Sequence, residues 1–225
     1  MTKWHLLNKK MKLEILAETP QYIVVVKTAG INVEKWDGFE SVEQIVFDYL
    51  KAQKPQAEPF VGVVHRLDRA VSGVLVLAKK KSILKLLNQQ FAEQKTEKKY
   101  QAIVENRPAK DKDTLQHFLY VNNKLRKAEV FSTKQKDSHE CRLSYHFAKK
   151  MEQGFLLDIK LWTGKFHQIR AQFASIGCPI VGDEKYGAKS VFQKDSIALH
   201  ACELSFFDPL TNEKLTFSKT ANFNL

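Results

Sequence analysis

Residues 60–78 have the sequence FVGVVHRLDRAVSGVLVLA, in which two apolar segments flank a short charged stretch. We expect strands at Phe60–Val64 and Val74–Ala78, because both segments are short, apolar and rich in β-branched side chains. Between them lies His65-Arg66-Leu67-Asp68-Arg69. Two buried strands would hold this backbone firmly while its polar side chains lie at a rim, which is how folds commonly present reactive groups. A plain charged turn between strands is the alternative that the spacing leaves open.

Upstream of this stretch, the apolar pattern predicts two short strands and one helix. Lys12–Lys27 predicts the strands on either side of Glu18-Thr19-Pro20, and the second should be buried because Tyr22–Val26 is wholly apolar. Ser41–Lys51 has apolar residues at helical spacing. It therefore predicts an amphipathic helix with Ser41 as its N-cap.

Downstream, two segments have the spacing of helices. Ser82–Lys95 predicts the first, capped by Ser82, and Phe166–Ile176 predicts the second, ended by Gly177. Many strands with few helices indicate a mixed α+β fold. The downstream strands are expected at Lys98–Glu105, 115–121, 126–132, 140–147, Phe155–Trp162 and, as a final hairpin, Ala198–Phe207 with Leu215–Ser218.

The composition limits the class of protein. The 225 residues are enough for one ordinary catalytic domain or two small ones, and 44% hydrophobic with 27% charged residues is typical of a folded soluble chain. Lys and Arg number 36 against 25 Asp and Glu, so the formal net charge is +11. Such an excess points to a polyanionic partner, nucleic acid first and an anionic membrane second.

Several other classes are excluded by what the sequence lacks. Its apolar stretches are too short to cross a bilayer, and Met1–His5 is not followed by the apolar core of a secretory signal. Three widely spaced cysteines form neither a zinc ribbon nor a disulfide framework, so we expect a reducing cytoplasm. No glycine-rich phosphate loop or serine-hydrolase elbow is present. Metal-ligand spacing is also absent among the candidate ligands His65, His167, His200 and Asp183.

Gly164–Arg170 is a second segment with candidate functional side chains. On a helix, Ile169, Phe173 and Ile176 would face the core, whereas His167 and Arg170, three residues apart, would share another face. A helix with a solvated basic face is the alternative.

Lys98–Glu105 is the third candidate segment. Alternation along a strand places Lys98, Tyr100 and Ala102 on one face. A tyrosine that only fills the core is the alternative here.

Taken together, these segments resemble the RluA family of RNA pseudouridine synthases over most of the chain. The catalytic motif of that family is similar to HRLDR at 65–69 and SGVLV at 72–76, and its tyrosine strand is similar to KKYQAIV at 98–104. Its third signature is similar to HQIR at 167–170 and PIVGD at 179–183, and its closing strand to LHA at 199–201. None of the departures from the family pattern, which include Glu105 or Asn106 in place of glycine, falls on the expected catalytic positions.

The resemblance implies an isomerase that detaches uracil from the ribose of an RNA uridine, turns it and rejoins it through C5. The implied fold is α+β, with a mixed, mainly antiparallel sheet and flanking helices. It implies one catalytic domain over residues 1–225, in the short form that has no separate S4 RNA-binding domain. The reaction involves no redox change, so we expect neither a cofactor nor a metal.

The resemblance assigns the essential carboxylate to Asp68, as nucleophile on the sugar or as base at C2′. It implies that Arg170 pairs with Asp68, which would lower the pKa of that carboxyl and orient it. It also implies that Tyr100 stacks on the target uracil, with a hydroxyl that could help to remove the C5 proton. Arg66 could fill the space of the flipped base or bind a phosphate. RNA contacts are expected from Arg66, His65, Arg69, Lys98, His167, Gln168 and Ile169.

The expected partner is therefore RNA, either ribosomal large-subunit RNA or tRNA, with no membrane, and a monomer is the default for such a domain. Two alternatives remain open. One is a non-catalytic RNA-binding or folding factor on the same scaffold. The other is a glycoside-cleaving enzyme that uses the same carboxylate and liberates uracil. Intact Asp68, Tyr100 and Arg170 favour the isomerase.

Overall fold

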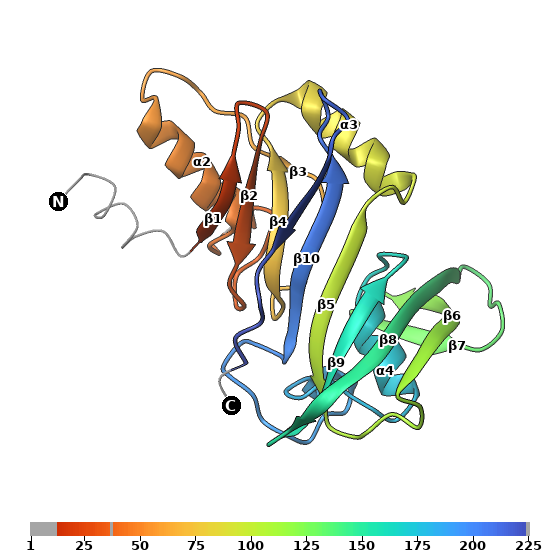
Figure 1. Cartoon of the computed structure of the whole chain (residues 1–225). Helices are drawn as coiled ribbons and strands as arrows, with labels where there is room; N and C mark the ends of the chain where they lie inside the picture. Colours follow the sequence, from red (N-terminus) through yellow and green to blue (C-terminus); the bar gives the residue numbers. More distant parts are fainter. Residues whose placement is uncertain (1–12, 37, 224–225) are drawn as a thin grey trace. The chain divides into compact units, whose positions relative to one another are not determined.

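The computed structural model describes residues 13–36 and 38–223, and the chain divides into two compact units (Figure 1). The first contains the residues up to Thr96 together with Glu203–Lys219, and the second contains Glu97–Cys202 together with the residues from Thr220 onward. Strand β10, Leu199–Phe207, passes from the second unit into the first. The expectation of one catalytic domain over residues 1–225 stays a prediction.

In the first unit the strands lie in the order β1-β2-β4-β10, with β11 beside β10 and β3 beside β4. β1 pairs antiparallel with β2, and β2 with β4. Helix α3 packs against β3 and β4. The elements are β1 Glu14–Glu18, β2 Tyr22–Lys27, α2 Val42–Gln53, β3 Gly62–Val63, β4 Ser72–Ala78, α3 Lys81–Ala92 and β11 Lys214–Ser218.

The core of the first unit is formed where α3 covers the sheet. Val24 of β2, Val76 of β4 and Phe206 of β10 are fully or almost fully buried with Leu87 of α3 in one cluster. Alternate residues of each strand point into this cluster, because successive side chains of a strand face opposite sides of the sheet. The sequence-based expectation of a buried β2 and of a final hairpin of β10 and β11 is confirmed.

The expected cap of helix α2 is also confirmed. The backbone N–H of Gln44 donates to Ser41 Oγ at 3.2 Å, and the helix begins at Val42. A serine oxygen is well suited to this position because the first N–H groups of a helix have no partner within it.

Two expectations in this unit are wrong in their bounds. The helix expected from Ser82 begins at Lys81 and ends at Ala92, with Lys80 at the N-cap, because the carbonyl of Lys80 already accepts the N–H of Leu84. The strand expected over Phe60–Val64 is only two residues long. Each strand has two edges, and β3 shares one edge of β4 with β10, which leaves room for only a short pairing.

In the second unit the strands lie in the order β10-β5-β9-β8-β6-β7. The pairs β5–β9, β9–β8, β8–β6 and β6–β7 are all antiparallel. Mixed sheets with few helices make this an α+β protein, as the sequence predicts. The elements are β5 Glu97–Val104, β6 Lys112–Asn122, β7 Lys127–Phe131, β8 His139–Met151, β9 Gly154–Leu161, α4 Gln168–Ser175 and the 3-10 turn η1 Glu184–Tyr186.

Helix α4 packs against β6 and β7, and it differs from its prediction mainly at its start. It begins at Gln168, because His167 has the left-handed backbone angles φ 51° and ψ 22° and serves as the N-cap. The expectation that His167 and Arg170 share a helix face is therefore wrong, because His167 lies outside the helix. Phe173 is buried as predicted, but Ile176 lies past the helix end and is 36% exposed. The predicted end at Gly177 is confirmed by its positive φ of 75°.

A buried lysine joins the sheet of the first unit to the loop after β3. Lys27, the last residue of β2, has no exposed surface, and its Nζ donates to three carbonyl oxygens. These belong to Thr28 at 2.9 Å, Arg69 at 3.0 Å and Val71 at 2.7 Å. An ammonium group carries three protons, so the three acceptors match its charged form. Burial lowers the pKa of Lys27 to about 7, a shift that the charge of Asp68 opposes and that of Arg69 reinforces.

We predict that Lys27→Met loosens this loop and lowers the free energy of unfolding by about 2 kcal/mol at pH 7. The substitution keeps the length of the side chain but leaves three buried carbonyls without their donor, a loss that relief of charge burial offsets only in part. Chemical denaturation measures the effect, and Lys85→Met on the exposed surface of α3 is the control. Equal denaturation midpoints for Lys27→Met and Lys85→Met would show that Lys27 does not stabilise the loop.

The stabilities of the wild type and of Lys27→Met should also depend differently on pH. The folded-state pKa of Lys27 is about 7 against an ordinary value of 10.5, so between these values the unfolded chain binds more protons than the folded one. The stability of the wild type should therefore rise with pH across this window, relative to Lys27→Met. Denaturation from pH 7 to 9 checks this, and a difference that stays constant or shrinks would contradict it.

Candidate functional site

The predicted site residues fall in both units, and each group is described within its own unit. His65, Arg66, Asp68 and Arg69 lie in the first unit on residues 64–71, which connect β3 to β4. Within this connection the backbone turns at 68–71, where the N–H of Val71 donates to the carbonyl of Asp68 at 3.0 Å. We call residues 64–71 the aspartate loop.

Buried side chains hold the aspartate loop from within the first unit. Leu67 is 7% exposed and Val71 is 2% exposed, so both anchor the loop in the core. His65 stacks on Phe91 of α3 with ring centroids 4.6 Å apart. The N–H of Val76 donates to His65 Nε2 at 3.2 Å, which ties the imidazole to the backbone of β4.

The remaining polar side chains of the aspartate loop lie toward its outer side. Asp68 is half-buried, whereas Arg66 and Arg69 are exposed. Arg66 forms an ion pair with Glu34 at 2.7 Å, and Arg69 Nε donates to the carbonyl of Gly30 at 2.9 Å. The arrangement places a carboxylate on a loop whose backbone is fixed by Lys27 and by buried neighbours, which is suited to acid–base or nucleophilic chemistry.

In the second unit, Lys98 and Tyr100 lie on β5. Tyr100 is 8% exposed and is paired in register with Ile159 of β9. Lys98 is half-buried, and burial lowers the pKa of its amine. A Cβ at Gly164 would lie 3.2 Å from Lys98 Nζ, so the glycine allows the close approach of this amine to the loop after β9.

Arg170 of α4 is bound in a two-pronged ion pair. Its Nε donates to Asp183 Oδ2 at 2.7 Å, and its Nη2 donates to Asp183 Oδ1 at 2.8 Å. Arg170 is 7% exposed and Asp183 is 1% exposed. The alternative of a solvated basic helix face is therefore wrong, because loops and strands of the same unit cover this side of α4.

Tyr186 joins α4 to β7. Its hydroxyl accepts the N–H of Ala128 at 2.7 Å and lies 3.0 Å from His167 Nδ1. The hydroxyl of Tyr186 therefore links the backbone of β7 to the imidazole of His167. Phe166 is 40% exposed and stacks on the imidazole with centroids 3.8 Å apart. The left-handed backbone of His167 is held in place by this stack and by the hydrogen bond.

The next two predicted RNA contacts, Gln168 and Ile169, are buried, at 3% and 5% exposed. Gln168 Oε1 accepts from Thr163 Oγ1 at 2.8 Å and from the N–H of Lys165 at 3.0 Å. Its Nε2 donates to the carbonyl of Arg142 at 3.2 Å. The amide thus ties the loop after β9 to the start of α4.

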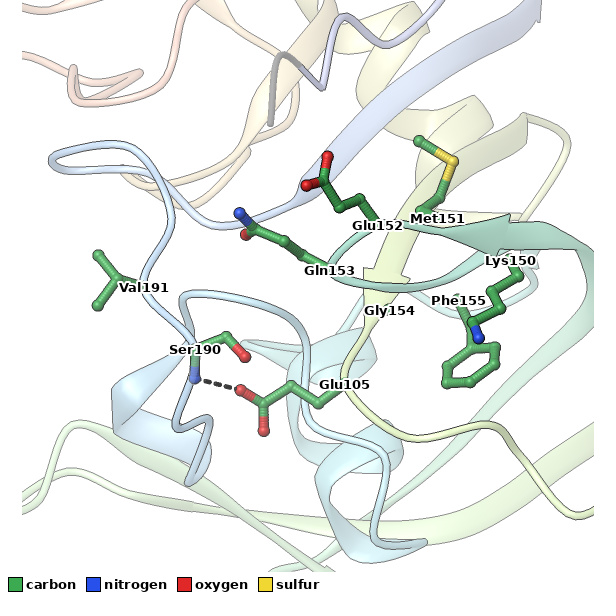
Figure 2. A pocket seen from close by; sticks show the side chains of 9 residues that line it. All are labelled: Glu105, Lys150, Met151, Glu152, Gln153, Gly154, Phe155, Ser190 and Val191. Atoms are coloured by element: carbon green, nitrogen blue, oxygen red, sulfur yellow. Dashed lines mark hydrogen bonds between the residues drawn. The ribbon is translucent and has the colours of Figure 1, made fainter.

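A pocket of about 580 Å³ lies elsewhere in the second unit, at the turn between β8 and β9, and none of the predicted site residues lines it (Figure 2). In Figure 2 the carboxylate of Glu105 points at the loop that carries Ser190. It accepts the N–H groups of Lys189 at 2.7 Å and Ser190 at 2.5 Å. Asn106 donates to the carbonyl of Gly177 at 2.7 Å. Glu105 and Asn106, one of which is expected to stand in place of a glycine, are therefore both engaged in holding loops.

Sequence reasoning missed three residues that position the predicted ones. Lys27 and Tyr186 carried no assigned role, and Asp183 was considered only as a metal ligand. The signal for Lys27 was a lone cation at the end of an apolar strand. Asp183 belongs to the PIVGD segment, but no spacing rule links Asp183 or Tyr186 to α4. Among the described residues, no group of three His, Cys, Asp or Glu side chains could hold a metal, and no helix is long and apolar enough to cross a membrane.

One protein-family model matches most of the chain. The chain matches the model of the family described as RNA pseudouridylate synthase over residues 21–175. This range includes the positions of Asp68, Tyr100 and Arg170.

Two relatives align with nearly the whole chain. The chain is 31% identical over 235 residues to a protein of Buchnera aphidicola subsp. Baizongia pistaciae (strain Bp) named ribosomal large subunit pseudouridine synthase C, with 96% of this chain and 72% of that protein covered. It is 33% identical over 226 residues to a protein of Vibrio parahaemolyticus serotype O3:K6 named tRNA pseudouridine synthase C, with 91% and 89% covered.

Solved structures agree in fold. The structure titled Human RNA Pseudouridylate Synthase Domain Containing 4 superposes with a TM-score of 0.77 at 20% identity, covering 97% of this chain and 90% of that chain. The family match spans most of the chain, and the aligned relatives exceed 30% identity. The chain therefore belongs to the RluA family of RNA pseudouridine synthases, which are isomerases that act on RNA.

Proposed function

We propose that this protein converts a uridine of structured RNA into pseudouridine, with Asp68 as the essential carboxylate. The observation that carries the proposal is the family match over residues 21–175, in which the aspartate loop, the tyrosine strand and Arg170 are all intact. It acts as a monomer in the cytoplasm, on ribosomal large-subunit RNA or tRNA. The names of the two relatives support both RNA classes.

Asp68 breaks the bond between N1 of uracil and C1′ of ribose, as nucleophile on the sugar or as base at C2′. Both roles need the carboxylate form and a fixed position. The clamp of Lys27 on the carbonyls of Arg69 and Val71 supplies the fixed backbone on the C-terminal side of Asp68.

Catalysis in this proposal also involves Arg170. A guanidinium has five N–H donors in a rigid plane, and two of them bind Asp183. This pair fixes the plane of the guanidinium, as does its position 5.1 Å from the centre of the Tyr186 ring. Asp183 and Tyr186 thereby act as positioning residues for Arg170.

Tyr100 stacks on the target uracil after the nucleotide has left its helix or loop. Flipping costs a few kcal/mol, about 1–3 kcal/mol of which an aromatic stack can offset. Arg66 takes the vacated space or binds a phosphate, which requires exchange of its exposed ion pair with Glu34. Such exposed pairs are weak, so a phosphate can replace the carboxylate.

The RNA backbone is held by cations around these groups, including Arg69 and Lys98. The buried side chains of Gln168 and Ile169 support the loop after β9, and His167 presents Phe166 beside them. The affinity should fall steeply with salt, because each bound phosphate releases condensed counterions.

We predict that Asp68→Asn abolishes isomerisation and leaves RNA binding largely intact, because the amide has the shape of the carboxylate without its charge or basicity. The assay measures release of tritium from RNA labelled at uridine C5, and a fall of at least ~10³-fold is expected. Asp48→Asn, on the exposed side of α2, is the matched control.

Site-resolved pseudouridine mapping in cells that lack the gene names the target. Wild-type protein should restore the missing pseudouridine and Asp68→Asn should not. A wild-type protein that binds RNA but releases no tritium would favour an RNA-binding factor, and free uracil in the products would favour a glycoside-cleaving enzyme. Either result overturns the proposal.

We predict that Tyr100→Phe keeps RNA binding and slows tritium release by roughly 100-fold, since the ring still stacks but the hydroxyl is lost. Single-turnover kinetics at saturating protein separate this step from binding. Tyr100→Leu removes the aromatic ring and should weaken binding as well. Wild-type rates in Tyr100→Phe would exclude the hydroxyl from proton removal.

We predict that Asp183→Asn impairs both stability and catalysis. It leaves the buried charge of Arg170 without its carboxylate, which costs about 3–5 kcal/mol. Thermal unfolding and single-turnover tritium release at a temperature where the variant is folded measure the two effects. Glu184→Gln, on the adjacent exposed residue, is the control, and full activity of folded Asp183→Asn would show that Arg170 needs no such support.

A further inference from the structure

The connection between β2 and α2 ends in an exposed aromatic tip. Trp36 is 62% exposed and Phe39 is 60% exposed. The N–H of Phe39 donates to the carbonyl of Trp36 at 3.0 Å, so the chain reverses direction between the two rings. We call these two residues the aromatic tip. Both residues lie in the connection that leads from β2 to α2.

One side of this connection is bonded to the aspartate loop. The N–H of Gly30 donates to the carbonyl of Arg69 at 2.8 Å, and Arg69 Nε donates back to the carbonyl of Gly30 at 2.9 Å. Closer to the tip, Glu34 pairs with Arg66 at 2.7 Å. The aromatic tip therefore stands only two residues beyond a direct contact with the loop of Asp68.

The other side is fixed to the start of helix α2. The N–H of Val42 donates to the carbonyl of Asn32 at 2.9 Å, and the N–H of Glu43 donates to the carbonyl of Val33 at 3.0 Å. The carboxylate of Glu43 in turn accepts the N–H of Lys35 at 2.9 Å. The base of the connection is thus held on both sides, and a held base presents the tip at a defined place.

Two large exposed aromatic rings on one short segment indicate a binding surface. Burial of aromatic surface is strongly favourable, and exposed aromatic clusters mark interaction sites. Lys35 precedes Trp36 in the chain, and Arg66 and Arg69 contact the same connection at Glu34 and Gly30; all three cations are exposed. Aromatic rings beside cations, in a chain of net charge +11, match the bases and phosphates of an unpaired RNA strand.

We propose that Trp36 and Phe39 stack on unpaired bases of the RNA that carries the target uridine, and so hold the strand beside the aspartate loop. The inference deepens the proposed function, on which it rests. It assigns the tip to single-stranded segments, because a base within a duplex offers no free face to a ring. The tip contributes to binding and not to the chemical step.

The test compares Trp36→Ala/Phe39→Ala with the wild type at one fixed salt concentration. The dissociation constant for a single-stranded oligouridylate should rise by about tenfold to a hundredfold per stacked ring, and that for a duplex of equal length should change little. Trp36→Phe should retain most of the affinity, since it keeps a ring. Leu210→Ala is the control, because Leu210 is 64% exposed and lies in the turn between β10 and β11.

Kinetics on unmodified transcripts of large-subunit ribosomal RNA and tRNA provide the second readout. The double variant should need more protein for half-maximal single-turnover tritium release and reach the wild-type maximal rate. An unchanged affinity for oligouridylate, or an equal loss for the duplex, would overturn the proposal. So would sedimentation that shows the wild type to be dimeric and the double variant monomeric, which would assign the tip to a second copy of the chain. If the wild type releases no tritium, the proposed function fails, but the oligouridylate affinities still test the tip.

Discussion

The buried ammonium of Lys27 is the contact on which the functional part of the first unit depends. Residues 64–71 form neither helix nor strand, so their carbonyls have no partners in a sheet ladder. Lys27 supplies donors to two of them and to Thr28, from the end of a central strand. One charge without exposed surface thus fixes the backbone on which Asp68 is carried. The desolvation that such a position costs is visible in the lowered pKa of the amine.

The second unit uses a different device, a chain of polar contacts among buried side chains. Asp183 holds Arg170 through two parallel hydrogen bonds, and Tyr186 binds both the backbone of β7 and the ring of His167. Each of these side chains has at least one hydrogen-bond partner, as burial demands. In each unit, therefore, a buried partner holds a residue proposed for catalysis: Lys27 holds the loop that carries Asp68, and Asp183 holds Arg170.

Much of the fold followed from patterns that act over a few residues. The apolar run of β2, the cap of α2 by Ser41 and the end of α4 at Gly177 are as predicted, because burial, capping and positive φ depend on neighbours in the chain. The errors occurred where distant segments compete. β3 is short because β10 occupies the same edge of β4, and α4 begins late because Tyr186 and Phe166 hold His167 outside the helix.

Motifs such as HRLD at 65–68 and HQIR at 167–170 are contiguous and specific, so they identify the family and the candidate residues without a structure. What holds those residues, and which aromatic rings are exposed, depends on contacts between distant segments. Asp183 was visible as a residue but not as the partner of Arg170, and Lys27 was visible only as the end of a strand. Partners far apart in sequence meet through the packing of whole elements, and no local spacing records which carbonyl or carboxylate a buried cation will meet.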